Sequence, residues 1–190
     1  MRSERKMLPI GVENFEKLRR NNMYYVDKTE IIADLLRNHG DANLFTRPRR
    51  FGKTLTMDTL KTFFEIGQDA SLFEGLAISR HSDICEKHQN KYPVVFISLK
   101  GAAGMNYPDA LKSIRTIVAR EARRLSYLNE SKILSDWEKQ ELNLLINCEK
   151  REFLSRDSPR STLLPGRLDR KVQCGIWRWV QRYCHQDSRR

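Results

Sequence analysis

The sequence has no apolar run that approaches the ~20 residues needed for a membrane-spanning helix. It also has no C-x-x-C pair among its four cysteines. Cys174, Cys184 and His185 lie close together in the sequence, but their spacing fits no zinc-binding pattern. The first residues are charged and no apolar segment follows them, so we expect no secretion signal. These absences argue against a membrane protein and a disulfide-rich secreted domain, and they predict a cytoplasmic protein with reduced thiols.

Apolar side chains are also scarce, at 39% of the 190 residues, whereas charged residues make up 31%. Leu, Ile, Val and Phe are nevertheless frequent enough to predict one globular domain with a core of its own. The net charge is +11, and residues 151–190 hold 10 basic residues against 4 acidic ones. That segment is rich in turn-forming residues and has aromatic residues without a period. We therefore predict a domain over residues 8–150 and a divergent, basic, poorly ordered tail over residues 151–190.

The most informative segment is Thr46-Arg-Pro-Arg-Arg-Phe-Gly-Lys-Thr54. It follows a short apolar run at residues 42–45 and precedes residues 55–64, whose apolar positions have helical spacing. Strand, basic loop, Gly-Lys-Thr and helix is the order of a phosphate-binding (Walker A) loop, in which backbone amides and the helix dipole converge on an anion. The usual first glycine is replaced by Arg47, so the loop must enter its turn differently, with Pro48 fixing one φ angle. A basic surface turn is the alternative interpretation.

Helical spacing of apolar residues predicts several further helices. Residues 11–20, the segment after Asp27, a long segment opened by Pro108, and residues 135–148 all show it. Asp27 and Glu30 have the spacing of a capping box, and Gly40 is placed to end that helix. Leu72, Phe73 and Leu76 are expected to anchor turns onto the core.

Residues 92–99, Tyr-Pro-Val-Val-Phe-Ile-Ser-Leu, are almost continuously apolar. Such a run is typical of a parallel strand that is covered on both faces. With a second strand near residues 42–46, it predicts an α/β fold of the P-loop NTPase type. That fold has three layers, a parallel sheet flanked by helices, and we expect it to be incomplete in this chain.

Residues 8–100 resemble the N-terminal part of the AAA-ATPase-like proteins common in anaerobic bacteria, which often carry a PD-(D/E)xK nuclease-type domain further along the chain. The phosphate-loop segment carries this resemblance together with four shorter blocks at residues 8–12, 24–29, 72–76 and 92–99. In that family the arginine-rich form is itself the phosphate loop. The resemblance implies ATP and Mg²⁺ as ligands, with Thr54 as the metal ligand. The implied nucleotide-binding residues are Arg49, Arg50, Phe51, Gly52, Lys53, Thr54 and Leu55.

The sequence departs from the family pattern after this region. The family supplies an apolar strand that ends in Asp-Glu, the Walker B element, which holds Mg²⁺ and polarises the attacking water. The nearest segment here, residues 142–149, has helical spacing instead. We therefore expect weak binding of ATP or GTP with little hydrolysis, because hydrolysis needs a positioned water as well as charge neutralisation. The loss of similarity near residue 150 is what a frameshift or a truncated reading frame would produce.

Two other functions remain open from the sequence. The chain could be a basic nucleic-acid-binding module that uses the loop arginines and a basic helix face, or a non-functional fragment whose sheet lacks strands. The basic helix face is formed by Arg115, Arg120, Arg123 and Arg124. A solvated helix face is the better explanation of these arginines. The sequence indicates neither the oligomeric state nor the process that nucleotide binding would serve.

Overall fold

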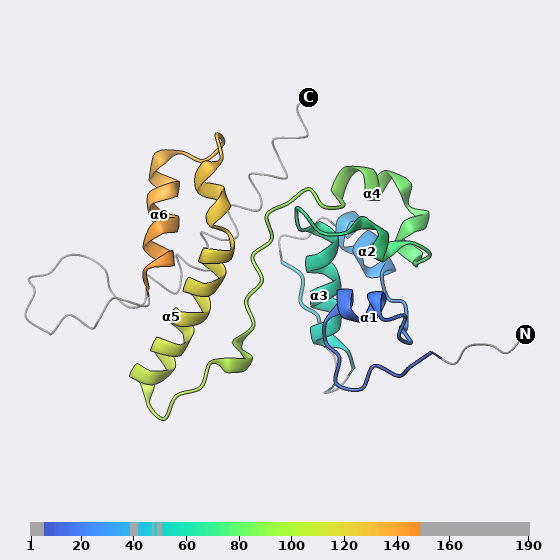
Figure 1. Cartoon of the computed structure of the whole chain (residues 1–190), viewed down its shortest axis with the longest axis horizontal. Coiled ribbons are helices and arrows are strands. Elements are labelled where there is room, and N and C mark those ends of the chain that lie inside the picture. The colour runs from blue at the N-terminus through green and yellow to red at the C-terminus, as the bar shows by residue number, and fades with distance from the viewer. Residues whose placement is uncertain (1–5, 39–41, 47, 49–50, 149–190) are drawn as a thin grey trace, which may run out of the picture. The chain divides into compact units, whose positions relative to one another are not determined.

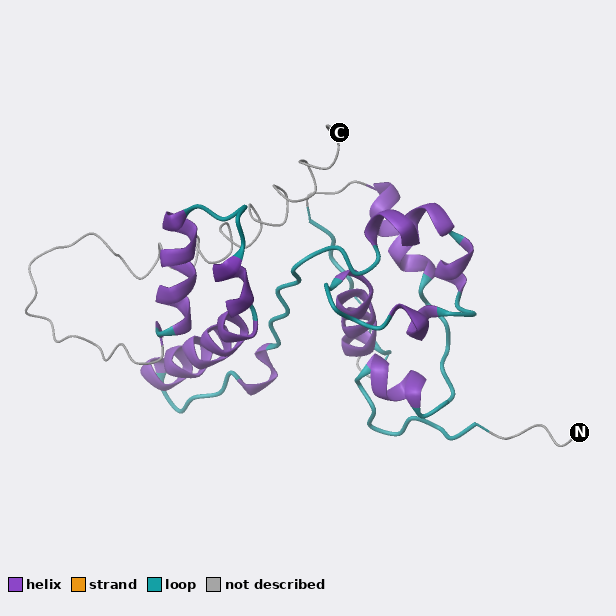
Figure 2. Ribbon diagram, turned by 45° about the horizontal axis from the view of Figure 1, so that its top comes forward, coloured by secondary structure: helices purple, strands orange, loops and turns teal. Residues whose placement is uncertain are grey.

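The structure is a computed structural model. It describes residues 6–38, 42–46, 48 and 51–148. The chain divides into two compact units, one that ends at Val94 and one that begins at Val95. Figures 1 and 2 show that the described part of both units consists of helices and connecting loops.

The first unit is built from short helices. Its α-helices are α1 (Phe15–Arg20), α2 (Glu30–Asn38), α3 (Lys53–Phe64) and α4 (Ser82–His88), and its 3₁₀ helices are η1 (Ala70–Phe73) and η2 (Ala77–Arg80). Helix α1 starts later than the sequence predicts, because Gly11 is left-handed with φ of 73° and Asn14 caps the helix by accepting from the amide of Lys17 at 2.7 Å.

One apolar cluster joins these elements. Aromatic rings form its centre: the ring centroids of Phe15 and Phe73 are 4.9 Å apart, and those of Phe63 and Phe73 are 5.2 Å apart. Ile32 from α2 and Ile78 from η2 are fully buried in the same cluster. Leu72, Phe73 and Leu76 are also buried, which confirms their predicted role as anchors.

The second unit contains a pair of helices that lie side by side (Figure 1). Its elements are η3 (Leu99–Gly101), α5 (Tyr107–Arg124), η4 (Ser126–Glu130) and α6 (Asp136–Ile146). Helix α6 starts with a capping box between Ser135 and Glu138. A small cluster of Leu125, Leu128 and Leu134, with Val95 and Leu142 against it, forms the buried centre of this unit.

The predicted three-layer parallel sheet is wrong. No strand ladder occurs among the described residues; Figure 2 shows no strand there, and the nearest approach to a sheet is an isolated parallel bridge between Glu65 and Tyr92. Residues 42–46 and 93–98 have no regular secondary structure.

The exposure of these two segments explains the error. Leu44 is 87% exposed and Ile97 is 37% exposed, so the apolar runs are not covered on both faces as a central parallel strand must be. The amide of Phe96 donates to the Oε1 atom of Glu121 on α5 at 2.6 Å, where a strand would use a neighbouring strand's carbonyl. An apolar run predicts burial, but it does not supply the partner that a strand needs.

The predicted capping box at Asp27 and Glu30 is also wrong. Helix α2 begins at Glu30, whose Oε1 atom lies 2.9 Å from Nε2 of His81 on a different segment. Asp27 turns its carboxylate to the amide and hydroxyl of Thr29. The predicted helix end at Gly40 and the whole tail over residues 151–190 lie outside the described residues. No helix in the described part of the chain is both long and apolar enough to cross a membrane.

Candidate phosphate-binding loop

A turn leads directly into helix α3 at the predicted phosphate loop. The amide of Phe51 donates to the carbonyl of Pro48 at 3.4 Å. Gly52 follows in the left-handed region, with φ of 75° and ψ of 22°. A side chain at this position would cost about 1–2 kcal/mol of backbone strain, so glycine is the residue that the turn requires. Arg47, Arg49 and Arg50 lie outside the described residues.

The start of helix α3 is suited to an anion by its backbone. Gly52 provides no side-chain cap, and the first turn contains no acidic residue. The N–H groups of Lys53, Thr54 and Leu55 are those for which an α-helix has no internal acceptor. The helix dipole adds a partial positive charge of about half an elementary charge at this end. A phosphate oxygen would therefore find donors and a favourable potential here.

The side chains of the first turn have different roles. The ammonium of Lys53 reaches back over the loop and donates to the carbonyl of Pro48 at 3.4 Å. Leu55 is half-buried and packs against the core of the unit. Thr54 is half-buried, and its hydroxyl is the group of the first turn that could bind a metal ion. Phe51 is 60% exposed beside the turn.

The rest of helix α3 fixes the loop to the core. Leu60 and Phe63 are buried in the aromatic cluster. The hydroxyl of Thr59 donates to the carbonyl of Leu55 at 2.8 Å. Asp58 accepts a hydrogen bond of 2.7 Å from the amide of Phe15 at the start of α1. The helix therefore holds its first turn in a fixed position relative to α1.

Lys28 lies at the same loop, although it is far from the loop in sequence. Its Nζ atom is 4.0 Å from the position that a Cβ atom on Gly52 would occupy. No carboxylate of the described residues forms an ion pair with Lys28. In the sequence, Lys28 belongs only to the block at residues 24–29 that carries the family resemblance, and nothing there predicts that it lies close to Gly52.

The residues on either side of Lys28 hold its backbone in place. Asp27 accepts from the amide of Ala77 at 2.6 Å through Oδ2, while its Oδ1 accepts from Thr29. Thr29 is fully buried, and its hydroxyl accepts from the amide of Ile78 at 3.1 Å. Asp27 and Thr29 therefore bind the segment around residue 77, while the side chain of Lys28 lies at Gly52.

Two carboxyl groups near this region have shifted pKa values. Burial alone would raise the pKa of Asp27, but hydrogen bonds from Thr29 and Ala77 outweigh it, so the pKa is lowered. Asp58 is half-buried, and its burial raises the pKa because the single bond from Phe15 compensates only in part. Both carboxyl groups already accept amide hydrogen bonds, which makes them structural parts of the loop's support.

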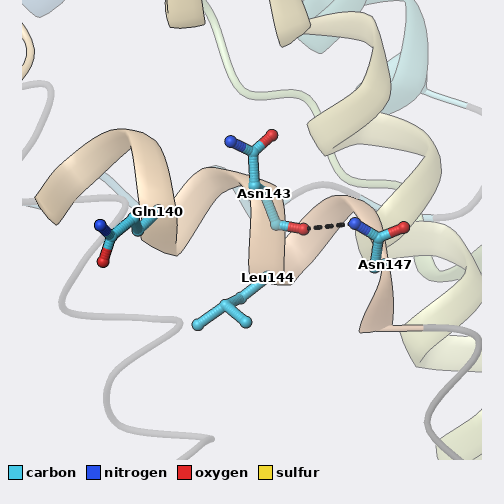
Figure 3. A pocket seen from close by; sticks show the side chains of 4 residues that line it. All are labelled: Gln140, Asn143, Leu144 and Asn147. Carbon is cyan, nitrogen blue, oxygen red and sulfur yellow. Dashed lines mark hydrogen bonds between the residues drawn. The ribbon is translucent and has the colours of Figure 1, made fainter. Parts of the chain in front are cut away.

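Other parts of the described structure offer less chemistry. No group of three or more His, Cys, Asp or Glu residues is arranged to hold a metal among the described residues. A shallow pocket in the second unit is lined by Gln140, Asn143 and Leu144 of α6 and by Asn147, the residue that caps its C-terminal end (Figure 3). Its polar groups are carboxamides, one of which donates to the carbonyl of Asn143. None of its side chains can transfer a proton.

The basic face of α5 is partly neutralised. Arg124 makes two hydrogen bonds to the carboxylate of Glu121, at 2.6 and 3.0 Å. Arg123 donates to the carbonyl of Ile146 at 3.4 Å. These contacts tie both arginines to other groups of the second unit.

Residues 142–146, which belong to the segment nearest to the expected Asp-Glu strand, are helical. Helix α6 spans Asp136–Ile146, which confirms the helix predicted from its spacing.

The predicted site residues that the structure describes lie together where the loop enters α3: Phe51, Gly52, Lys53, Thr54 and Leu55. Lys28 also lies at this loop, although the sequence did not predict it there.

Comparison with known proteins gives a family for this arrangement. The family described as Predicted AAA-ATPase matches residues 9–155. A protein of Azotobacter chroococcum mcd 1, named as an uncharacterized protein in the vnfD 5′ region, is 41% identical over 98 residues. The aligned region covers 51% of this chain and 18% of that relative, so the chain spans only a small part of the relative's length. No solved structure matches this chain.

Proposed function

Because the chain belongs to the Predicted AAA-ATPase family, we propose that its loop at Gly52 binds the phosphates of ATP. The observation that carries this proposal is the start of helix α3: an uncapped helix end without acidic residues, preceded by a left-handed glycine and flanked by the ammonium of Lys53. Amides and an ammonium that converge on one point form a site for a polyphosphate.

Each residue of the site has a separate role in this proposal. Gly52 lets the backbone turn toward the ligand, and the amides of Thr54 and Leu55 donate to phosphate oxygens. Lys53 moves from the carbonyl of Pro48 to the phosphates. Arg49 and Arg50 add positive charge near the phosphates, because they precede Gly52 by only three and two positions in the sequence. Phe51 lies beside the turn and precedes the glycine directly. The hydroxyl of Thr54 would hold Mg²⁺, which would neutralise part of the phosphate charge.

We expect binding with little hydrolysis from this chain. Hydrolysis needs a positioned water in addition to phosphate neutralisation. Within residues 8–150 the sequence has no apolar strand that ends in Asp-Glu. Turnover should therefore stay below the ~1 s⁻¹ at which typical enzymes begin.

Isothermal titration with ATP and Mg²⁺ tests the proposal on the whole chain. Lys53→Ala should weaken binding about 10- to 100-fold, since a hydrogen bond to a charged group contributes about 1.5–3 kcal/mol. Lys87→Ala is the matched control, because Lys87 is exposed on α4 and its replacement removes the same charge away from the loop. The circular dichroism spectrum of each variant should match that of the wild type.

Two results would contradict the proposal. The first is wild-type protein that does not bind ATP, and the second is equal loss of affinity in the Lys53 and Lys87 variants. Steeply salt-dependent binding to DNA without affinity for ATP would favour the nucleic-acid module instead.

A further inference from the structure

We infer that Lys28 contacts the phosphates bound at this loop, together with Lys53. Lys28 belongs to the Asp27-Lys28-Thr29 segment, which lies beside the loop. This inference rests on the proposed function, since it needs a phosphate-bearing ligand at Gly52. It assigns to the site a residue that lies 24 positions before the glycine.

The position of Lys28 is the first argument. Its Nζ atom lies 4.0 Å from the position that a Cβ atom on Gly52 would occupy. The ammonium is therefore close to a residue of the loop that has no side chain to shield its backbone. An ion that approaches the amides after Gly52 therefore comes within reach of a flexible ammonium. Lysine contributes a point charge with three rotatable donors, which suits a phosphate of any orientation.

The charge around Lys28 is the second argument. Lys28 is exposed and pairs with no carboxylate of the described residues. The first turn of α3 also lacks an acidic residue. The ammonium of Lys28 thus lies beside a positive helix end whose first turn carries no acidic residue. An anion bound at this helix end would lower the local positive potential.

The anchoring of Lys28 is the third argument. Asp27 and Thr29 are both fixed to the segment that begins η2, through the amides of Ala77 and Ile78. The backbone of Lys28 lies between these two fixed residues, so only its side chain moves when a ligand binds. A cation with a fixed backbone loses less entropy on binding than one on a mobile loop.

Titration of the full chain with Mg²⁺-ATP, and competition by inorganic tripolyphosphate, tests this inference. We expect Lys28→Gln to weaken both ligands by about tenfold, the factor that 1.4 kcal/mol produces. Lys28→Arg should restore most of the affinity for both, because it keeps the charge. Lys87→Gln is the matched control and should bind like the wild type.

The outcomes separate this inference from the proposed function. If wild-type protein binds neither ligand, the proposed function fails and the inference fails with it. If Lys53→Ala weakens binding while Lys28→Gln binds like the wild type, only the inference is overturned. Weaker ATP binding with unchanged tripolyphosphate binding would also overturn it, since Lys28 would then act away from the phosphates. Thermal unfolding at an unchanged midpoint shows that Lys28→Gln acts on the ligand and not on the fold.

Discussion

The carboxylate of Asp27 joins two segments that are 50 residues apart in the sequence. One oxygen accepts from the amide and hydroxyl of Thr29, and the other accepts from the amide of Ala77. These bonds favour the ionised form and lower the pKa of Asp27 against the opposing effect of burial. A folded-state pKa below the unfolded value of about 3.9 means that the stabilisation is fully present above about pH 4 and is lost as the pH falls through the folded pKa.

Asp27→Asn should therefore destabilise the protein in a pH-dependent way. The amide cannot accept through both of its ends, so we expect a loss of about 1 kcal/mol at pH 7. The difference from the wild type should shrink as the pH falls below 4, because protonation of the wild-type carboxylate then increasingly favours the unfolded state. Urea denaturation at pH 7 and pH 3 measures both effects.

The control for Asp27→Asn is Asp34→Asn on α2. Asp34 is largely exposed and makes only a long ion pair of 3.9 Å with Arg37, so its replacement should change stability by less than about 0.5 kcal/mol. An equal effect of Asp27→Asn at both pH values would contradict the assigned role of the carboxylate.

Among the elements, helix α3 is the one that links the core to the loop. It carries the half-buried Asp58, which accepts from the amide of Phe15 at the first position of α1. Burial raises the pKa of Asp58, so the folded state disfavours its ionised form. The contribution of this group to stability therefore decreases as the pH rises from about 4 through the folded pKa.

Replacing Asp58 separates its hydrogen bond from its charge. Asp58→Ala leaves the Phe15 amide without its acceptor and should cost about 1–2 kcal/mol. Asp58→Asn keeps an acceptor and removes the buried charge, so its stability at pH 7 should equal or exceed that of the wild type. Thermal unfolding of both variants between pH 4 and pH 7 measures the difference. A loss in Asp58→Asn as large as that in Asp58→Ala would show that the charge itself is needed.

Helices were easier to predict from the sequence than the sheet was. The spacing of Leu111, Ile114 and Val118 locates α5, and Pro108 and Asn106 mark its start, because helical contacts are local in the sequence. Residues 92–99 have an equally clear apolar pattern, but a strand also depends on a neighbour that may lie anywhere in the chain. The pattern alone could not show that Phe96 bonds to Glu121 on a helix.

The candidate site follows the same division. Gly52, Lys53 and Thr54 were predicted because a phosphate loop is a contiguous motif. Lys28 was not predicted to lie at the loop, because no pattern in the sequence around it indicates that it contacts Gly52, 24 positions later. The sequence feature that could have identified Lys28 is the order Asp27-Lys28-Thr29. In this order two residues that hydrogen-bond to each other flank a lysine whose side chain is left for another contact.

At the scale of the whole molecule, each unit has its own buried cluster. The first cluster is aromatic and is centred on Phe15, Phe63 and Phe73, whereas the second contains the leucines at 125, 128 and 134. The candidate phosphate-binding loop belongs to the first unit, where α3 connects it to Phe63. The stability of the loop therefore depends on the aromatic cluster.

Phe63→Ala tests this dependence. Phe63 is fully buried, and its truncation should lower the free energy of unfolding by about 3–5 kcal/mol. Met57→Ala on the same helix is the control, because Met57 is 43% exposed and should cost less than about 1 kcal/mol. Urea denaturation followed by circular dichroism measures both, and similar losses in the two variants would contradict the assigned core.

The hydrogen bond from Lys53 to the carbonyl of Pro48 has a consequence for how quickly a ligand can be taken up. The ammonium of Lys53 already donates to the carbonyl of Pro48 in its own turn. An incoming anion would therefore have to replace this carbonyl as the acceptor before all three N–H groups of the ammonium could bind it. At 3.4 Å this internal contact is long, and the exchange is correspondingly easy. Under the proposed function, uptake would exchange one acceptor of the Lys53 ammonium for another, and the ammonium would keep an acceptor until the ligand arrives.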